Sequence, residues 1–259
     1  VYTFKFSYTN DKEATVSFAH TFSNDRVTAK INLFKVDKET GKAVPQGDAT
    51  LKGAVYGLYA REDIVYPDGA TGTIYKAGEQ VASLTTDDKG QASVNGLYLG
   101  KYYVKEITPP TGYLADAEEH DLTCSYEGDM TAEVKRECTS SEQVIKQPFQ
   151  IIKAANNGKT DADLLSGAGF TVYLKSSLTK KADGSYDFDS AKPVVSGENG
   201  ATEIFTDEKG YACSIPLPFG SYIVRETTTP HNYKPVDDFE VNITAVSYTH
   251  LTLPTICSV

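Results

Sequence analysis

Two glutamates stand at strand positions that normally carry apolar side chains. Glu106 lies on the apolar face of the alternating stretch GKYYVKEITPPTGY (100–113), and Glu226 takes the same place in GSYIVRETTTPHNY (220–233). An ionised, unpaired carboxylate in a sheet core would cost several kcal/mol. Each glutamate is therefore expected to be exposed, protonated or paired with a partner.

Two lysines are placed in the same way in earlier strands. Lys35 shares the apolar face of INLFKVDKETG (31–41), and Lys153 shares that of FQIIKAANNG (149–158). Burial favours the neutral amine of a lysine, which is a nucleophile, and the protonated form of an acid, which can relay a proton. A lysine and an acid held in contact have the means for a nucleophilic reaction without an enzyme, because proximity replaces concentration. The alternative is that each Lys/Glu pair is only a buried salt bridge.

The chain contains two copies of one unit. Glu106 and Glu226 are 226 − 106 = 120 positions apart, and TTDDKG (85–90) returns as FTDEKG (205–210) at the same offset. A period of about 120 residues is the size of a whole domain, whereas solenoid repeats are much shorter. No segment shows a helical period over ten or more residues, so the predicted fold class is all-β, with tandem β-sandwich domains.

The composition excludes several function classes. The chain has 259 residues, with 17 Tyr, 11 Phe, one Met and no Trp. It contains no run of 18 apolar residues, so no membrane span is expected. A net charge of −10 argues against nucleic acid as a partner, since phosphate binding needs clustered Lys and Arg. Of the four cysteines, Cys124 and Cys138 are expected to be buried free thiols, with a pairing between neighbouring strands as the alternative.

No pattern in the sequence predicts a turnover enzyme, a cofactor or a metal site. The four histidines, at positions 20, 120, 231 and 250, lie in different segments and lack triad or metal-ligand spacing. DGSYDFD (183–189) lacks the Gly and the distal Glu of an EF-hand, so a solvated hairpin tip is expected there and not a calcium loop. Residues 63–78 and 179–200 are expected to be surface loops, and 126–134, which carries EGDM, is a candidate hairpin turn.

Several of these segments resemble a known family. KVDKETGKAV, GAVYGLYA and LTTDDKGQASVNGLYLGKYYVKEITPPTGY are similar to the SpaA-type pilin domain, also called the collagen-adhesin B-type repeat. The resemblance implies prealbumin-like (Ig-like, reverse-topology) sandwiches in an extracellular, cell-wall anchored protein of Gram-positive bacteria. It also implies an intramolecular isopeptide bond from Lys to Asn or Asp, assisted by a buried Glu or Asp.

The resemblance divides the chain into four parts. Residues 1–27 are expected to be the C-terminal strands of a preceding, truncated domain, and 28–146 to be a SpaA-type sandwich. Residues 147–246 are expected to be a second such sandwich that lacks its last strand. The tail 247–259 resembles translated adapter read-through, and its LPTIC is similar to a sortase signal only superficially.

The position of the acceptor follows from the same resemblance, because in the family it lies shortly before the lysine of the next unit. Asn24 precedes Lys35 by 35 − 24 = 11 positions, so Asn24 would serve a preceding domain. Glu142 precedes Lys153 by 153 − 142 = 11 positions and stands where Asn or Asp is expected. Because Glu is one methylene longer and not the usual acceptor, the first unit is expected to lack the bond. A substitution of Glu142 by Asn would then help only if Lys35 can contact position 142. Without its last strand, the second unit would keep Lys153 as a free amine facing Glu226.

The predicted function is a structural stalk segment of a surface adhesin or pilin, with isopeptide bonds that give mechanical and proteolytic stability. Its expected partners are neighbouring repeats of the same polypeptide, the cell wall through an anchor outside this sequence, and possible host surface ligands. The alternative is a ligand-binding β-sandwich that recognises a host glycan or protein, with the loop residues Tyr66 and Tyr75 as candidates. The second unit is expected to be cut by protease beyond about residue 147 before the first unit is cut.

Overall fold

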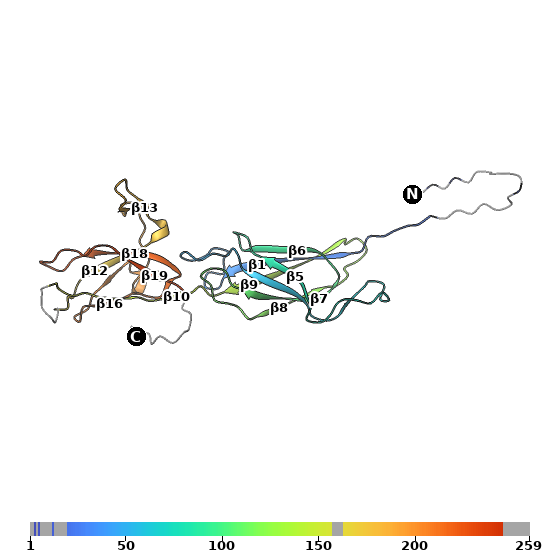
Figure 1. The fold of residues 1–259 in the computed structure, drawn as a ribbon, viewed down its shortest axis with the longest axis horizontal. Coiled ribbons are helices and arrows are strands. Elements are labelled where there is room, and N and C mark those ends of the chain that lie inside the picture. The colour runs from blue at the N-terminus through green and yellow to red at the C-terminus, as the bar shows by residue number, and fades with distance from the viewer. Residues whose placement is uncertain (1–2, 4, 6–11, 13–19, 157–162, 246–259) are drawn as a thin grey trace.

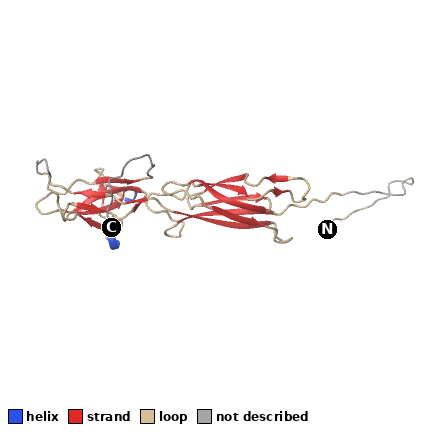
Figure 2. Ribbon diagram, turned by 90° about the horizontal axis from the view of Figure 1, so that it is seen from below, coloured by secondary structure: helices blue, strands red, loops and turns tan. Residues whose placement is uncertain are grey.

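The structure, a computed structural model, consists of two β-sandwich units that lie end to end (Figures 1 and 2). It describes residues 3, 5, 12, 20–156 and 163–245. Most of the strands expected in residues 1–27 and all of the tail 247–259 lie outside the described residues, and residues 20–27 form no strand. Among the described residues, no helix has the length and apolar character needed to cross a membrane.

The first unit contains two sheets that face each other, with strand orders β5-β2-β7-β8 and β6-β1-β9. The strands are β1 (Thr28–Asp37), β2 (Val55–Ala60), β3 (Ile64–Val65), β4 (Thr73–Tyr75), β5 (Gln80–Thr85), β6 (Gln91–Leu97), β7 (Gly100–Thr108), β8 (Glu119–Cys124) and β9 (Glu133–Glu142). Burial alternates strictly along β1, as expected for a strand with one face on the core.

The last strand of the first unit lies beside its first strand. β9 pairs with β1 in parallel over the whole length of both, from Thr28 opposite Glu133 to Asp37 opposite Glu142. The hairpin predicted at 126–134 is wrong, because β8 and β9 belong to different sheets and this segment crosses from one sheet to the other.

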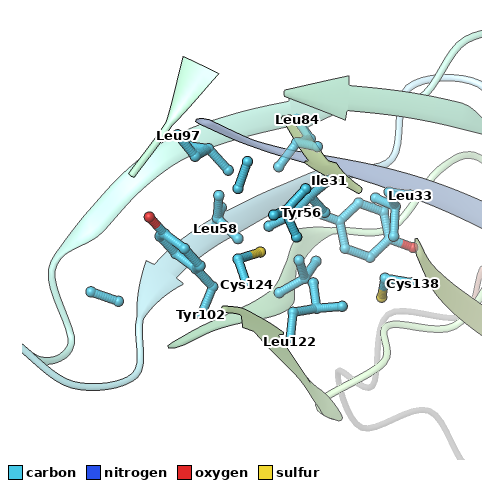
Figure 3. Packing of buried hydrophobic residues seen from close by; sticks show 14 of the residues in the cluster. Ile31, Leu33, Tyr56, Leu58, Leu84, Leu97, Tyr102, Leu122, Cys124 and Cys138 are labelled. Atoms are coloured by element: carbon cyan, nitrogen blue, oxygen red, sulfur yellow. The ribbon is translucent and has the colours of Figure 1, made fainter. Parts of the chain in front are cut away.

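The core of the first unit is an aromatic and aliphatic cluster between the two sheets. Figure 3 shows the rings of Tyr56 and Tyr102 within this cluster, and both residues are fully buried. Cys124 and Cys138 are also buried there and are free thiols, which confirms the sequence prediction for this pair.

The second unit repeats the larger sheet but only part of the smaller one. Its strands are β10 (Lys146–Gln147), β11 (Gln150–Ile152), β12 (Gly169–Leu174), β13 (Thr179–Lys180), β14 (Tyr186–Asp187), β15 (Glu203–Phe205), β16 (Tyr211–Cys213), β17 (Leu217–Pro218), β18 (Gly220–Thr228) and β19 (Phe239–Ile243), with 3-10 turns at Lys175–Ser177 and Glu198–Gly200. The sheet β15-β12-β18-β19 corresponds to β5-β2-β7-β8. β11 pairs with β16 as β1 pairs with β6, and no described strand takes the place of β9.

The expected loops of both units carry short hairpins. β3 pairs with β4 within 63–78, and β13 pairs with β14 within 179–200. The second hairpin confirms the hairpin expected around residues 183–189.

A structured joint connects the two units. β10 pairs with β17, and the Phe219 ring packs on a cluster of the first unit that includes Tyr113 and Val144. The backbone N–H of Phe219 donates to Ile145 O at 2.8 Å, and Asp48 N–H donates to Phe219 O at 2.9 Å. The joint therefore combines apolar contact with backbone hydrogen bonds that bridge the units.

Candidate functional site

Three charged side chains from three strands meet inside the first unit. Lys35 comes from β1 and Glu142 from the end of β9 in the same sheet, whereas Glu106 comes from β7 in the facing sheet. The register of the β1/β9 ladder sets Lys35 opposite Ser140, so Glu142 lies two residues further along on the same inward face. Because successive side chains of a strand point to opposite faces of the sheet, these positions direct all three side chains into the core.

Lys35 contacts both carboxylates. Its Nζ lies against Glu142 Oε2 and is 3.7 Å from Glu106 Oε1, and at most 2% of any of the three side chains is exposed. Apart from this ion pair and the longer contact with Glu106, Lys35 Nζ and Glu142 Oε2 have no hydrogen-bond partner among the described residues. The ion pair is therefore the main interaction that offsets the free-energy cost of removing the two charged groups from water.

Two hydroxyl groups hold the other oxygen of Glu142. The Tyr56 hydroxyl donates to Glu142 Oε1 at 2.6 Å, and the Ser140 hydroxyl donates to the same atom at 3.1 Å. A carbonyl oxygen held by two donors is polarised, and the same donors would stabilise negative charge that develops on it. This arrangement suits attack on the Glu142 carboxyl carbon.

Burial brings Lys35 and Glu106 towards their neutral forms. It lowers the pKa of Lys35 to about 8, against the raising effect of the Glu106 and Asp116 charges. Burial also raises the pKa of Glu106, against the lowering effects of the Asp116 backbone N–H and of Lys35. That N–H donates to Glu106 Oε2 at 2.8 Å, which leaves Oε1 directed at the lysine. A neutral amine beside an acid is the pairing that nucleophilic attack with proton relay requires.

A glycine behind each lysine explains why Gly ends both copies of the repeated TDDKG/TDEKG segment. Gly90 has φ +71°, and a Cβ there would lie 2.8 Å from Lys35 O. Gly210 has φ +72°, and a Cβ there would lie 2.7 Å from Lys153 O. Only glycine combines this conformation with such a close backbone approach.

The second unit repeats the pair but not the third member. Lys153 Nζ donates to Glu226 Oε2 at 2.8 Å, and the backbone N–H of Val236 donates to the same oxygen at 2.7 Å. Glu226 Oε1 is buried and has no hydrogen-bond partner among the described residues. Phe170 of β12 lies opposite Glu226 of β18, just as Tyr56 of β2 lies opposite Glu106 of β7. Phe170 therefore takes the place of Tyr56 in the second unit. The second unit therefore has the lysine and the acid but lacks the aromatic hydroxyl.

The structure brings together both predicted Lys/Glu pairs and adds Glu142 to the first. Whether any of them reacts stays a prediction. Asn24 is exposed in the segment before β1, and its predicted role concerns a domain outside this sequence. Sequence reasoning missed Tyr56 and Ser140, which only the fold places beside Glu142. It also missed the backbone donors to the glutamates, although each follows its glutamate by ten residues, at 116 and 236.

The loop tyrosines do not converge on a common site. Tyr66 is 36% exposed, and its ring packs edge-on against Tyr98 with centroids 5.9 Å apart. Tyr75 packs against the core of the first unit.

One group of potential metal ligands escaped the sequence analysis. Asp116, Glu118 and His120 offer ligand atoms within 4.8 Å of one another, a grouping that the separation of the four histidines along the sequence does not reveal. Asp116 and Glu118 precede β8 and His120 is its second residue. The three residues are spaced by two, which places them on one side of an extended chain.

Sequence comparison decides the family. The family model for the SpaA prealbumin-like fold domain matches residues 29–137 and again residues 148–253. The chain belongs to this family. Its all-β fold is thus two tandem SpaA prealbumin-like domains, as the sequence predicted. None of the curated proteins compared with the chain matches it.

Solved structures resemble this pair of SpaA domains. The Bacillus anthracis TIE protein is 24% identical, with a TM-score of 0.54 over 84% of this chain and 32% of its own. The shaft pilin SpaA from Lactobacillus rhamnosus GG is 19% identical, with a TM-score of 0.31 over 84% of this chain and 94% of its own. The major pilin SpaD from Corynebacterium diphtheriae is 11% identical, with a TM-score of 0.32 over 83% of this chain and 91% of its own. The chain spans about a third of the TIE protein, and at these identities the likeness concerns the fold alone.

Proposed function

We propose that this chain is a stalk segment of a cell-wall anchored adhesin or pilin of a Gram-positive bacterium. We propose further that its first domain is sealed by an amide bond between Lys35 and Glu142. The juxtaposition of Lys35, Glu106 and Glu142 inside a SpaA domain is the observation that carries this proposal. The domain boundaries at 28–146 and 147–246 are part of it.

The course of the chain supports a role as a spacer. Because β1 and β9 run parallel, the chain enters the first domain at one end and leaves it at the other. It continues directly into the second domain through the joint around Phe219. Domains connected in this way extend an array along one axis, with neighbouring repeats of the same polypeptide as the immediate partners. A cell-wall anchor, further pilin subunits and a host ligand would be contacts of the whole protein.

The proposed reaction joins the lysine to the carboxyl carbon of Glu142. The neutral Nζ of Lys35 attacks this carbon while Tyr56 and Ser140 hold Oε1. Glu142 enters the reaction protonated on Oε2, by transfer of one proton from the Lys35 ammonium that lies against it. As the neutral Nζ attacks, Glu106 accepts a second proton from the nitrogen and gives one to Oε2, which leaves as water. One Nζ–Cδ bond forms, one C–O bond breaks and one water is lost, so Glu106 ends in its starting state.

Glu142 can serve as the acceptor because of the geometry at the end of β9. The expectation that the first domain lacks the bond was based on residue type, since Glu is longer than Asn or Asp. The β1/β9 register places Glu142 two residues past the position opposite Lys35, and the longer side chain extends back to the amine. Contact between the reacting groups is the main requirement for a reaction that occurs once per molecule.

Intact-mass measurement with peptide mapping tests the cross-link. We expect the purified chain to be lighter than its sequence by one water, with a branched peptide that joins Lys35 to Glu142. Lys35→Met should restore the full mass, whereas Lys153→Met should leave the loss of water unchanged. An unmodified Lys35 in the native chain would refute the cross-link.

Surface display on a bacterium tests the stalk. The chain would be inserted between a wall anchor and a terminal epitope, and antibody access to the epitope measured. We expect access to increase when this pair of domains is added to a short anchor. Unchanged access would count against the spacer role, whatever the mass result.

A further inference from the structure

The acidic side chains around the start of β8 divide into a paired set and an unpaired set. Glu119 and Asp121 both form ion pairs with Arg61. Asp116 and Glu118 lie on the other side of the extended chain, and among the described residues neither forms an ion pair with Lys or Arg. Two carboxylates of the first domain therefore lack the cation that their sequence neighbours have.

His120 adds a nitrogen atom that also lacks a partner. Its Nε2 is inaccessible to solvent and has no hydrogen-bond partner among the described residues. Asp116 Oδ2 lies 3.9 Å from Nε2, which is too long for a hydrogen bond. A buried polar atom without a partner is unfavourable, and imidazole is the commonest metal ligand in proteins. A metal ion between the ring and the carboxylate would satisfy both groups.

The ligand atoms are close enough to share one ion. Two ligand atoms of one Zn²⁺ ion can be up to about 4.3 Å apart, because each lies about 2.0–2.2 Å from the metal. Asp116 Oδ2 and His120 Nε2 already meet this condition. The backbone N–H of Glu118 donates to Asp116 Oδ1 at 3.0 Å, which leaves Oδ2 directed at the ring. All three ligand atoms lie within 4.8 Å of one another, and the exposed Glu118 side chain can close the remaining gap by a change of rotamer.

The second domain has the same framework without these ligands. The β7/β8 and β18/β19 ladders place Phe239 where His120 stands, since each pairs with the matching valine of the neighbouring strand. Val236 stands where Asp116 does, because the backbone N–H of each donates to the glutamate of its domain. The fold therefore does not require polar side chains at these positions, and their presence in the first domain needs another explanation.

We propose that Asp116, Glu118 and His120 bind one divalent transition-metal ion of the Zn²⁺ type. One imidazole nitrogen and two carboxylate oxygens suit Zn²⁺, whereas Ca²⁺ and Mg²⁺ prefer oxygen ligands alone. The group borders a hollow of about 400 Å³ between β8 and β9, from which a water molecule would supply the fourth ligand. The ion would brace the segment whose backbone N–H holds Glu106 Oε2. The inference does not require the amide bond to form.

Titration of the intact, metal-free chain with Zn²⁺ tests the site. Binding is measured by calorimetry, and the histidine ring nitrogens are followed by NMR of the ¹⁵N-labelled chain. We expect one saturable site, at which the Nε2 signal of His120 moves and those of the other three histidines do not. Asp116→Val, Glu118→Gln and His120→Phe should each weaken binding by at least about tenfold, because loss of a group that only orients a ligand already costs about 10–100-fold. These variants should fold, since the second domain carries Val and Phe at the equivalent positions and the Glu118 side chain is exposed.

His231→Asn is the matched control, because His231 is an exposed histidine of the second domain and lies outside the group. This variant should bind Zn²⁺ as the native chain does. No saturable binding at Zn²⁺ concentrations up to about 100 μM would overturn the proposal and leave Asp116 and His120 as a long ion pair. Binding that survives all three substitutions in the group would overturn it as well.

Competition tests the choice of metal. Ca²⁺ in about tenfold excess should not displace Zn²⁺, because Ca²⁺ takes oxygen ligands and would leave the imidazole unused. Displacement by Ca²⁺ would refute the assignment to a transition metal. Zinc binding and the mass loss at Lys35 are measured separately, so failure of one leaves the other result intact.

Discussion

Removal of one hydroxyl group, by Tyr56→Phe, should slow formation of the Lys35–Glu142 amide by about 10²–10³-fold. The Tyr56 ring is fully buried and its hydroxyl donates to Glu142 Oε1 at 2.6 Å, a short bond to an oxygen that gains charge during attack. Phenylalanine should fit without disturbing the core, because Phe170 occupies the matching position of the second domain.

The magnitude follows from the position of the donor. Loss of one preorganised donor to a developing oxyanion in a water-free site costs about 2.7–4 kcal/mol of transition-state stabilisation. Ser140 still donates to the same oxygen at 3.1 Å, so the lower half of this range is expected. Before the amide forms, the folded chain also loses a buried hydrogen bond to the Glu142 carboxylate, which should lower the free energy of unfolding of the unreacted chain by about 1.5–3 kcal/mol.

The assay is a time course of amide formation during synthesis in a cell-free system. Samples are quenched in acid, and the fraction that has lost one water is measured by intact mass. Tyr102→Phe is the matched control. The Tyr102 hydroxyl also donates a hydrogen bond of 2.6 Å, but to the backbone oxygen of Tyr98 and not to Glu142. If Tyr56→Phe and Tyr102→Phe react within about threefold of each other, the oxyanion argument is refuted.

Three further outcomes are expected. In Glu142→Ala, which cannot form the amide, the unfolded chain binds more protons than the folded chain between pH 8 and 10.5, because the pKa of Lys35 falls from 10.5 to about 8 on folding. The free energy of unfolding, measured by urea titration, should therefore rise with pH across this window, and a flat profile would contradict the burial of a neutral amine. Gly90→Ala should destabilise the first domain by more than Gly41→Ala in the same titration, because both have positive φ but only at Gly90 would a Cβ meet backbone, at 2.8 Å. Phe219→Ala should lower the free energy of unfolding by about 1–3 kcal/mol and broaden the distribution of angles between the domains in small-angle X-ray scattering; an unchanged distribution would show that the joint does not depend on this ring.

The repeat and the strand alternation were sufficient to predict the fold and half of the site. Lys35 and Glu106 stand at inward positions of strands with clear period-two patterns, so their burial together follows from the sandwich architecture. The same holds for Lys153 and Glu226.

Contacts that depend on sheet topology were beyond the sequence. The parallel pairing of β9 with β1 places Glu142 at the amine, but nothing local in residues 126–134 distinguishes a crossover from a hairpin. Tyr56 looks like an ordinary core aromatic until the position of Glu142 is known. The joint at Phe219 likewise depends on how two domains meet, which no periodicity within either domain encodes.

The parallel β1/β9 ladder has a consequence when the ends of the protein are pulled apart. Tension enters at Thr28 and leaves beyond Glu142, at opposite ends of two strands that are paired over their whole length. The ladder is therefore loaded in shear, and its hydrogen bonds must break together instead of one after another. With the amide formed, the load passes from β1 through Lys35 to Glu142 and bypasses residues 36–141, which are 141 − 36 + 1 = 106 residues. The cross-linked domain would transmit tension as an almost inextensible link, while the second domain, with no described strand in the place of β9, would be the part of the pair that yields.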